Sequence, residues 1–133
     1  MNGSSRSRPV VLCVVDQETA VKLRKQVLEA AGYKVLSATS AHQALEIFRA
    51  SRIDLVLIEN VVPTMIDSTT LAATLRMLRP QVPIGIYSPD LAVSPEDRRF
   101  ADEFITKLVS VEELVRIVER LLSRRGVARA KAG

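Results

Sequence analysis

The sequence has one cysteine, few aromatic residues and no long apolar run, and each shortage excludes a class of protein. The single cysteine, Cys13, cannot form an internal disulfide, and its place inside an apolar run indicates an inert core thiol. Apolar stretches such as 10–15 fall far short of the roughly 20 residues that a membrane span needs. The first residues lack the apolar region of a signal peptide, so we expect a cytoplasmic location.

The two ends of the chain lack acidic residues, although the net charge of the whole chain is +4. All 15 acidic residues and 13 of the 19 basic residues lie in 10–123, which gives that stretch a net charge of −2. We therefore expect one domain at 10–123 between flexible basic tails at 1–9 and 124–133. The tails contain no aromatic side chain on which a base could stack, so nucleic-acid binding by this domain is not expected.

Hydrophobic residues make up 47% of the 133 residues, which suits a single globular core. Short β-branched runs alternate with segments of helical periodicity. We predict strands near 10–15, 33–38, 53–58, 83–88 and 103–106, and helices over 18–31, 41–51, 68–79, 95–101 and 111–123. Parallel neighbours need crossover connections, so the alternation predicts an α/β fold whose doubly wound parallel sheet carries helices on both faces.

Serine residues mark the start of three predicted helices. Ser40 with Gln43, and Ser110 with Glu113, fit the S/T-x-x-E/Q capping box, in which the two side chains bond the backbone reciprocally. The pair at 94–95 is Ser-Pro, which places serine at a cap and proline at the first helical position. These three boundaries are therefore fixed by local chemistry as well as by periodicity.

Polar side chains follow four of the predicted strands. They are Asp16 and Gln17, Glu59, Ser88, and Lys107. Because the carboxyl ends of parallel strands share one edge of the sheet, these groups are expected to meet in a crevice there. Each has a plainer alternative when taken singly: Asp16 as a helix cap, Ser88 as part of a turn, Lys107 as a solvated loop residue.

The chain resembles the receiver domain of two-component response regulators over about 10–122, through the stretches VLCVVDQE, DLVLIENVVP, IGIYSP and DEFITK. The resemblance implies a flavodoxin-like, five-stranded sheet of order 2-1-3-4-5 with five helices, the fourth shortened. In that family an aspartate accepts a phosphoryl group from a histidine kinase beside a bound Mg²⁺. By resemblance Glu59 stands at the acceptor, Asp16 and Gln17 at the acidic pair that holds Mg²⁺, Ser88 and Lys107 at the phosphoryl contacts, and Phe104 at the aromatic that reports the change.

Three departures from the family pattern bear on this chemistry. Glu59 replaces aspartate, and its extra methylene displaces the carboxylate by about a bond length and a half. Positioned phosphoryl transfer is sensitive to displacements of about 1 Å, so in-line attack should be lost. Gln17 replaces a carboxylate, which leaves Asp16 and Glu59 as ligands for at most a weakly held Mg²⁺. Leu108 replaces a proline that follows a cis bond in the family, so we expect a trans bond and a shifted Lys107 loop.

Two interpretations of Glu59 follow from charge. In one, its longer carboxylate reaches Lys107 and Ser88 and forms a fixed ion pair that stands in part for an acyl phosphate, which locks an active-like state. In the other, Glu59 pairs with Lys107 for structure alone. Phe104 is in the same way either part of a two-state switch or an ordinary core residue.

The expected partner surface comprises residues 89–123. Its last helix has more apolar residues than one docking face needs: Val111, Leu114, Val115, Ile117, Val118, Leu121 and Leu122. Such a stripe fits a homodimer or another protein partner, or else a helix that is deeply buried in its own domain. The one histidine, His42, has no second ligand near it in sequence and is expected at the surface.

The sequence thus predicts an atypical receiver that is not an enzyme and needs no cofactor. We expect a phosphorylation-independent interaction module that contacts a histidine kinase, an output domain or another signalling protein. One alternative is a working Mg²⁺-dependent receiver that a histidine kinase phosphorylates, with Glu59 as the candidate acceptor. A second alternative is a flavodoxin-like ligand-binding domain. The acidic turn at 16–18 argues against it, because it would repel a phosphate group rather than bind one.

Overall fold

The computed structural model describes residues 8–15, 18–59, 68–88, 101–106 and 109–132. The strands are β1 (Val10–Val14), β2 (Lys34–Ala38), β3 (Leu55–Glu59), β4 (Ile84–Ser88) and β5 (Glu103–Thr106), and the helices are α1 (Glu18–Ala30), α2 (Ala41–Ala50), α3 (Ser68–Leu78) and α5 (Val111–Ala132). All five strands and the first three helices begin and end within two residues of the predicted limits. The helix predicted over 95–101 and its Ser-Pro cap lie outside the described residues, apart from residue 101.

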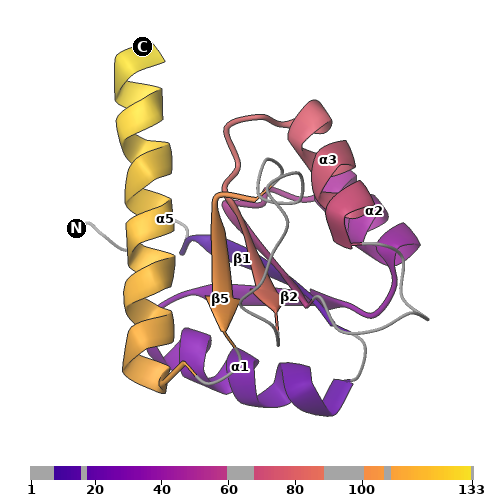
Figure 1. The fold of residues 1–133 in the computed structure, drawn as a ribbon, viewed down its shortest axis with the longest axis vertical. Coiled ribbons are helices and arrows are strands. Elements are labelled where there is room, and N and C mark those ends of the chain that lie inside the picture. The colour runs from indigo at the N-terminus through magenta and orange to yellow at the C-terminus, as the bar shows by residue number, and fades with distance from the viewer. Residues whose placement is uncertain (1–7, 16–17, 60–67, 89–100, 107–108, 133) are drawn as a thin grey trace.

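The strands form one parallel sheet in the order β2-β1-β3-β4-β5, so the predicted doubly wound architecture is confirmed. Figure 1 shows α1 and α5 on one face of this sheet and α2 and α3 on the other. Every residue of β1 and of β3 is buried, because central strands of such a sheet are covered on both faces. Within the described ranges, no helix has the length and apolar composition that a membrane crossing requires.

The side chains of the central strands alternate between two separate cores. The core under α2 and α3 includes Val56 and Ile58 of β3, together with Phe48 of α2. The core under α1 and α5 includes Leu55 and Leu57, which point to the opposite face. Because neighbouring strand residues point to opposite faces, Glu59 lies on the α1 and α5 face with the second pair.

Local hydrogen bonds explain where several helices begin and end. The backbone of Gln43 donates to the Ser40 hydroxyl at 3.1 Å, and that of Glu113 donates to the Ser110 hydroxyl at 3.1 Å, which is the serine half of each predicted capping box. The side chain of Gln43 accepts from the amide of Thr39 at 2.8 Å, one residue before the predicted donor. Helix α1 ends in a Schellman motif, in which Gly32 has a positive φ of 102°. There the amide of Gly32 donates to the carbonyl of residue 29 at 3.0 Å, and the amide of residue 33 donates to that of residue 28 at 3.0 Å.

Two aspartates fasten the amino ends of neighbouring strands in the same way. The amide of Val10 donates to Asp54 at 2.8 Å, and the Asp54 amide donates back to the Val10 carbonyl at 2.8 Å. Ile84 and Asp102 repeat this exchange at 2.8 and 2.7 Å. A one-residue slip of either strand would break a pair of bonds and turn every side chain to the wrong face, so these pairs help to fix the register.

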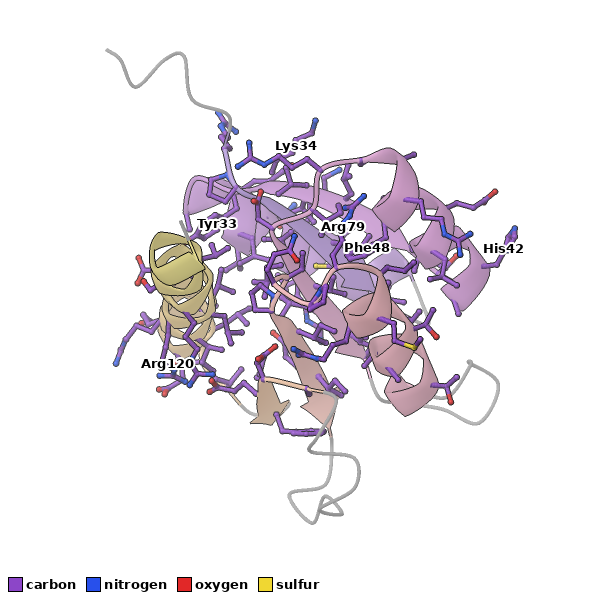
Figure 2. All side chains as sticks on the ribbon, turned by 90° about the horizontal axis from the view of Figure 1, so that it is seen from above. Tyr33, Lys34, His42, Phe48, Arg79 and Arg120 are labelled. Carbon is purple, nitrogen blue, oxygen red and sulfur yellow. The ribbon has the colours of Figure 1, made fainter. Side chains whose placement is uncertain are left out.

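Arg79, which follows α3, ties that helix to the end of α2. Its guanidinium donates to the carbonyl of Ser51 at 3.1 Å and lies 4.7 Å from the ring centre of Phe48. Figure 2 shows the two labelled side chains next to each other. The contact satisfies a carbonyl at a helix end, where no backbone partner is available, and so holds the two helices of this face together.

Helix α5 continues through Ala132, so the predicted end of this helix at residue 123 is wrong. The charge of the segment after 123 favours a tail when the sequence alone is considered. Alanine and arginine are among the best helix formers, however, and a single glycine costs only about 1 kcal/mol relative to alanine. Periodicity could not show this extension, because the segment has no apolar stripe to continue.

The Asp54 exchange gives a test of how strongly the amino edge is held. Replacing Asp54 with alanine leaves the buried amide of Val10 without its acceptor, so the free energy of unfolding should fall by about 1–3 kcal/mol. Asp54→Asn keeps an acceptor oxygen and should lose less, and Glu112→Ala, at an exposed position, should change little. Urea denaturation of the three variants would measure these differences. Equal losses for Asp54→Ala and Asp54→Asn would contradict the assignment.

Candidate functional site

The carboxyl edge of the sheet carries Glu59 at the end of β3 and Ser88 at the end of β4. The register pairs Glu59 with Tyr87, so the two strands end side by side as predicted. Of the other predicted site residues, Asp16, Gln17 and Lys107 lie outside the described residues, as does Leu108 with its peptide bond. For Ser88 the structure describes the backbone and not the side chain.

Glu59 is buried, with 4% of its surface exposed, and Arg24 of α1 binds its carboxylate with both terminal nitrogens. Arg24 Nη1 lies 2.6 Å from Glu59 Oε1, and Nη2 donates to Oε2 at 3.0 Å. The arginine side chain is itself only 18% exposed. The Nη2–Oε2 contact is a charge-assisted hydrogen bond, and the Nη1–Oε1 contact is a close ion-pair approach of opposite charges.

Sequence reasoning missed Arg24, although a signal for it was present. Residues 21, 24, 27 and 28 lie three and four positions apart, so Arg24 falls on the inward stripe of the predicted helix among apolar neighbours. A charged residue on a buried stripe needs a partner of opposite charge, because an unpaired buried charge is costly. The buried carboxylate at the end of β3 was the available candidate.

The ring of Tyr87 packs against the flat face of the same guanidinium. The central carbon of Arg24 lies 4.0 Å from the centre of the Tyr87 ring, which is the geometry of a cation–π contact. Burial opposes the charge of Arg24, but the hydrogen bond and the charge of Glu59 outweigh it and raise the pKa of Arg24 above its usual value. The guanidinium is therefore permanently charged and fixed by two neighbouring strands.

Two acidic groups near this cluster resist ionisation. Burial raises the pKa of the Cys13 thiol to about 12, although the charge of Arg24 opposes the shift. Burial also raises the pKa of Tyr87 to about 12, again against the effect of Arg24. Cys13 is 1% exposed, and this confirms the prediction of an inert core thiol.

Phe104 is half-buried and packs against the core under α2 and α3. It pairs in register with Ile86 of β4, whereas Glu59 pairs with Tyr87. Phe104 and the Arg24–Glu59 pair therefore lie on opposite faces of the sheet. Its predicted part in a switch stays a prediction.

The described part of the site does not fit Mg²⁺. Both oxygens of Glu59 face a guanidinium, and a divalent ion about 4 Å from that charge would meet a repulsion of about 8 kcal/mol at an effective dielectric constant of about 20. In the ranges that the structure describes, no three His, Cys, Asp or Glu side chains gather as a metal site. The predicted second ligand, Asp16, falls outside these ranges.

The predicted partner surface is described over β5 and α5. Among the apolar residues of the α5 stripe, Leu114, Ile117, Val118 and Leu121 are buried, Val115 and Leu122 are half-buried, and Val111 is 54% exposed. The stripe packs mostly against its own sheet, which favours the deep-burial alternative over a dimer contact. Val111 and Leu23 line a hollow of about 170 Å³ between α1 and the start of α5, which Arg24 and Tyr87 also line.

His42 lies at the surface, as predicted. Its ring Nε2 is 3.7 Å from Glu46 Oε1, one turn further along α2, and both side chains are exposed. Figure 2 shows the labelled His42 pointing away from the sheet.

Known proteins share this architecture. The family model for the response regulator receiver domain matches residues 11–119. The probable transcriptional regulatory protein TcrX of Mycobacterium tuberculosis is 30% identical over 132 residues, covering 95% of this chain and 55% of TcrX. The alkaline phosphatase synthesis transcriptional regulatory protein PhoP of Bacillus subtilis is 28% identical over 127 residues, covering 89% of this chain and 50% of PhoP. This chain thus spans about half the length of these curated relatives.

A solved structure agrees over nearly the whole chain. The CheY-like response regulator receiver domain protein of Methanospirillum hungatei superposes with a TM-score of 0.82 at 26% identity. The match covers 92% of this chain and 99% of the other chain.

A double-mutant cycle would measure the Arg24–Glu59 pair. Arg24→Met leaves a buried carboxylate without this partner and should lower the free energy of unfolding by about 3 kcal/mol. Glu59→Gln should also destabilise, whereas the double variant Arg24→Met/Glu59→Gln removes both charges and should lose less than the sum of the two. Additive losses in urea denaturation would show that the two side chains do not interact.

The raised pKa values predict alkaline sensitivity. Between about pH 9 and 12 the thiol of Cys13 and the hydroxyl of Tyr87 stay protonated in the folded state but ionise in the unfolded state. The unfolded state then binds fewer protons, so the free energy of unfolding falls as pH rises through this window. Denaturation series across it should show a shallower fall for Tyr87→Phe and for Cys13→Ala than for the wild type. Parallel curves would contradict the prediction.

Proposed function

The chain belongs to the response regulator receiver domain family, and on this premise we propose that it is a receiver that works without phosphorylation, as a protein-interaction module. The observation that carries the proposal is the two-point ion pair between Arg24 and Glu59 at the end of β3. That position is where the resemblance places the phosphoacceptor. The family identifies a signalling module, and the pair bears on how this member signals.

Phosphoryl transfer needs a carboxylate oxygen that is free to attack in line and is held in the right place. Both oxygens of Glu59 face the guanidinium of Arg24, and the side chain is buried. An attacking oxygen would have to give up its contact with Arg24 while the rest of the carboxylate stayed in place. The extra methylene of glutamate adds a displacement to which positioned reactions are sensitive. Both features disfavour Glu59 as an acceptor.

The pair also gives the crevice a fixed charge distribution. The guanidinium of Arg24 keeps its positive charge near neutral pH, because its pKa is raised above its usual value. Arg24 is an ion-pair partner of Glu59, a role that the sequence alone predicts for Lys107.

The domain would then bind its partner through a surface whose conformation does not depend on phosphorylation. We infer that the partner contacts the predicted surface of residues 89–123, of which the structure describes 101–106 and 109–123, and that it is a histidine kinase, an output domain or another signalling protein. TcrX and PhoP are about twice as long as this chain and are named transcriptional regulatory proteins. A further domain in the same protein is therefore a reasonable partner for this face. A cytoplasmic location and a homodimer stay predictions.

The proposal is tested by offering the protein what a working receiver needs. Amide-proton NMR is recorded with Mg²⁺, then with Mg²⁺ and beryllofluoride, a mimic of the acyl phosphate, and intact mass is measured after incubation with acetyl phosphate. We expect no change in the amide chemical shifts of Ile58 and Glu59 and no added phosphoryl mass, because the Glu59 carboxylate is already paired with Arg24. An ordinary receiver with aspartate at this position serves as the positive control.

The alternative of a working acceptor predicts the opposite result. Saturable shifts that start at Glu59 and spread through β4 to Phe104, with a phosphoryl group that disappears in Glu59→Gln, would overturn the proposal. A phosphoryl group that persists in Glu59→Gln would instead place the acceptor at another residue, and would also overturn it.

A further inference from the structure

We propose that Arg24 is the residue that excludes a divalent cation from this crevice, because its guanidinium occupies the place beside Glu59 that such a cation would need. The inference rests on the proposed function and gives it a cause in a single side chain. It assigns a role to α1, an element to which the family resemblance assigns no functional residue. Exclusion of the cation then has its own cause, Arg24, which is distinct from the replacement of the acceptor aspartate by Glu59.

The first step concerns the space around the carboxylate. Mg²⁺ requires oxygen ligands at about 2.0–2.1 Å in near-octahedral arrangement. The two terminal nitrogens of Arg24 already lie 2.6 and 3.0 Å from the two oxygens of Glu59. A cation that bound either oxygen at its required distance would come into contact with the guanidinium, which carries charge of the same sign. Arg24 must therefore leave before a cation can bind.

The second step concerns whether Arg24 can leave. It cannot do so by losing its proton, since its pKa is raised above a value that is already outside the physiological range. It cannot swing into solvent without giving up the face of Tyr87, whose ring centre lies 4.0 Å away. That movement would also strip the buried Glu59 of this counter-ion. The guanidinium is therefore held in place on two sides.

The third step concerns what a variant without this charge would do. In Arg24→Met the buried carboxylate of Glu59 loses a positive partner and gains space on the same side. A divalent cation can then supply the missing charge, and any ligand that binds the folded state alone stabilises it. Removing Arg24 should therefore convert a protein that is indifferent to Mg²⁺ into one that Mg²⁺ stabilises.

The experiment follows the thermal unfolding midpoint of the full chain as Mg²⁺ is added, together with the broadening of the Ile58 and Glu59 amide signals by Mn²⁺. The wild type should not respond. Arg24→Met should show a midpoint that rises with Mg²⁺, and Mn²⁺ binding at least about tenfold tighter than the wild type. Lys25→Met is the matched control, because it removes the same charge from the same helix at an exposed position. It should behave like the wild type.

A second variant keeps the test valid if Arg24→Met does not fold. Arg24→Gln removes the charge but leaves an amide that can donate to Glu59, and it should respond to Mg²⁺ in the same direction. Adding Glu59→Gln to either variant should abolish the response, because the carboxylate is the proposed ligand. A response that survives Glu59→Gln would place the cation elsewhere and overturn the inference.

The remaining outcomes separate the inference from the proposed function. Folded Arg24 variants that ignore Mg²⁺ would overturn the role of Arg24 and leave a phosphorylation-independent receiver standing. An equal response from Lys25→Met would also overturn it, since general charge would then be the cause. A wild-type protein that binds Mg²⁺ with beryllofluoride would instead overturn the proposed function.

Discussion

The arrangement at the carboxyl edge depends on one constraint: a carboxylate buried at the end of a central strand needs a positive charge beside it. Arg24 supplies that charge from α1, so the ion pair also fixes where α1 lies against β3 and β4. Tyr87 completes the arrangement by covering the face of the guanidinium. Because removing one member of a buried pair leaves the other uncompensated, the two residues constrain each other and the helix that carries one of them.

The pair can form because the opposite edge of the sheet is held in register. Asp54 and Asp102 exchange backbone bonds with the first residues of β1 and β4, and side-chain alternation carries that register along each strand. A shift of one residue in β3 would turn Glu59 away from Arg24 and toward the apolar core under α2 and α3. The chemistry at one edge thus depends on hydrogen bonds at the other, about five residues away along each strand.

Much of the fold could be predicted from the sequence, because β-branched runs, helical periodicity and capping boxes are local signals that tertiary packing did not override. The end of α5 could not be predicted, since a charged segment without an apolar stripe lacks the hydrophobic periodicity that indicates a helix. The position of Glu59 was predicted, but its partner Arg24 was not. Resemblance directs attention to residues that a family uses, and Arg24 lies on a helix to which the resemblance assigned no functional residue. The charge on the inward stripe of α1 was the local evidence, and it becomes interpretable only once β3 and α1 are known to pack on the same face.

A fixed ion pair also limits how such a domain could be regulated. A two-state protein shifts toward one state only when something binds the two states with different affinity. In an ordinary receiver the phosphoryl group and its cation provide that difference, and under the proposed function neither binds here. The balance between any two surface conformations is then set by the sequence, and a partner protein that prefers one of them is what remains to shift it. Moving such an equilibrium from about 1:99 to 99:1 requires a preference of about 10⁴-fold, a large demand on a single contact face. A domain that keeps one surface conformation needs no such preference, and control can then act through the partner protein.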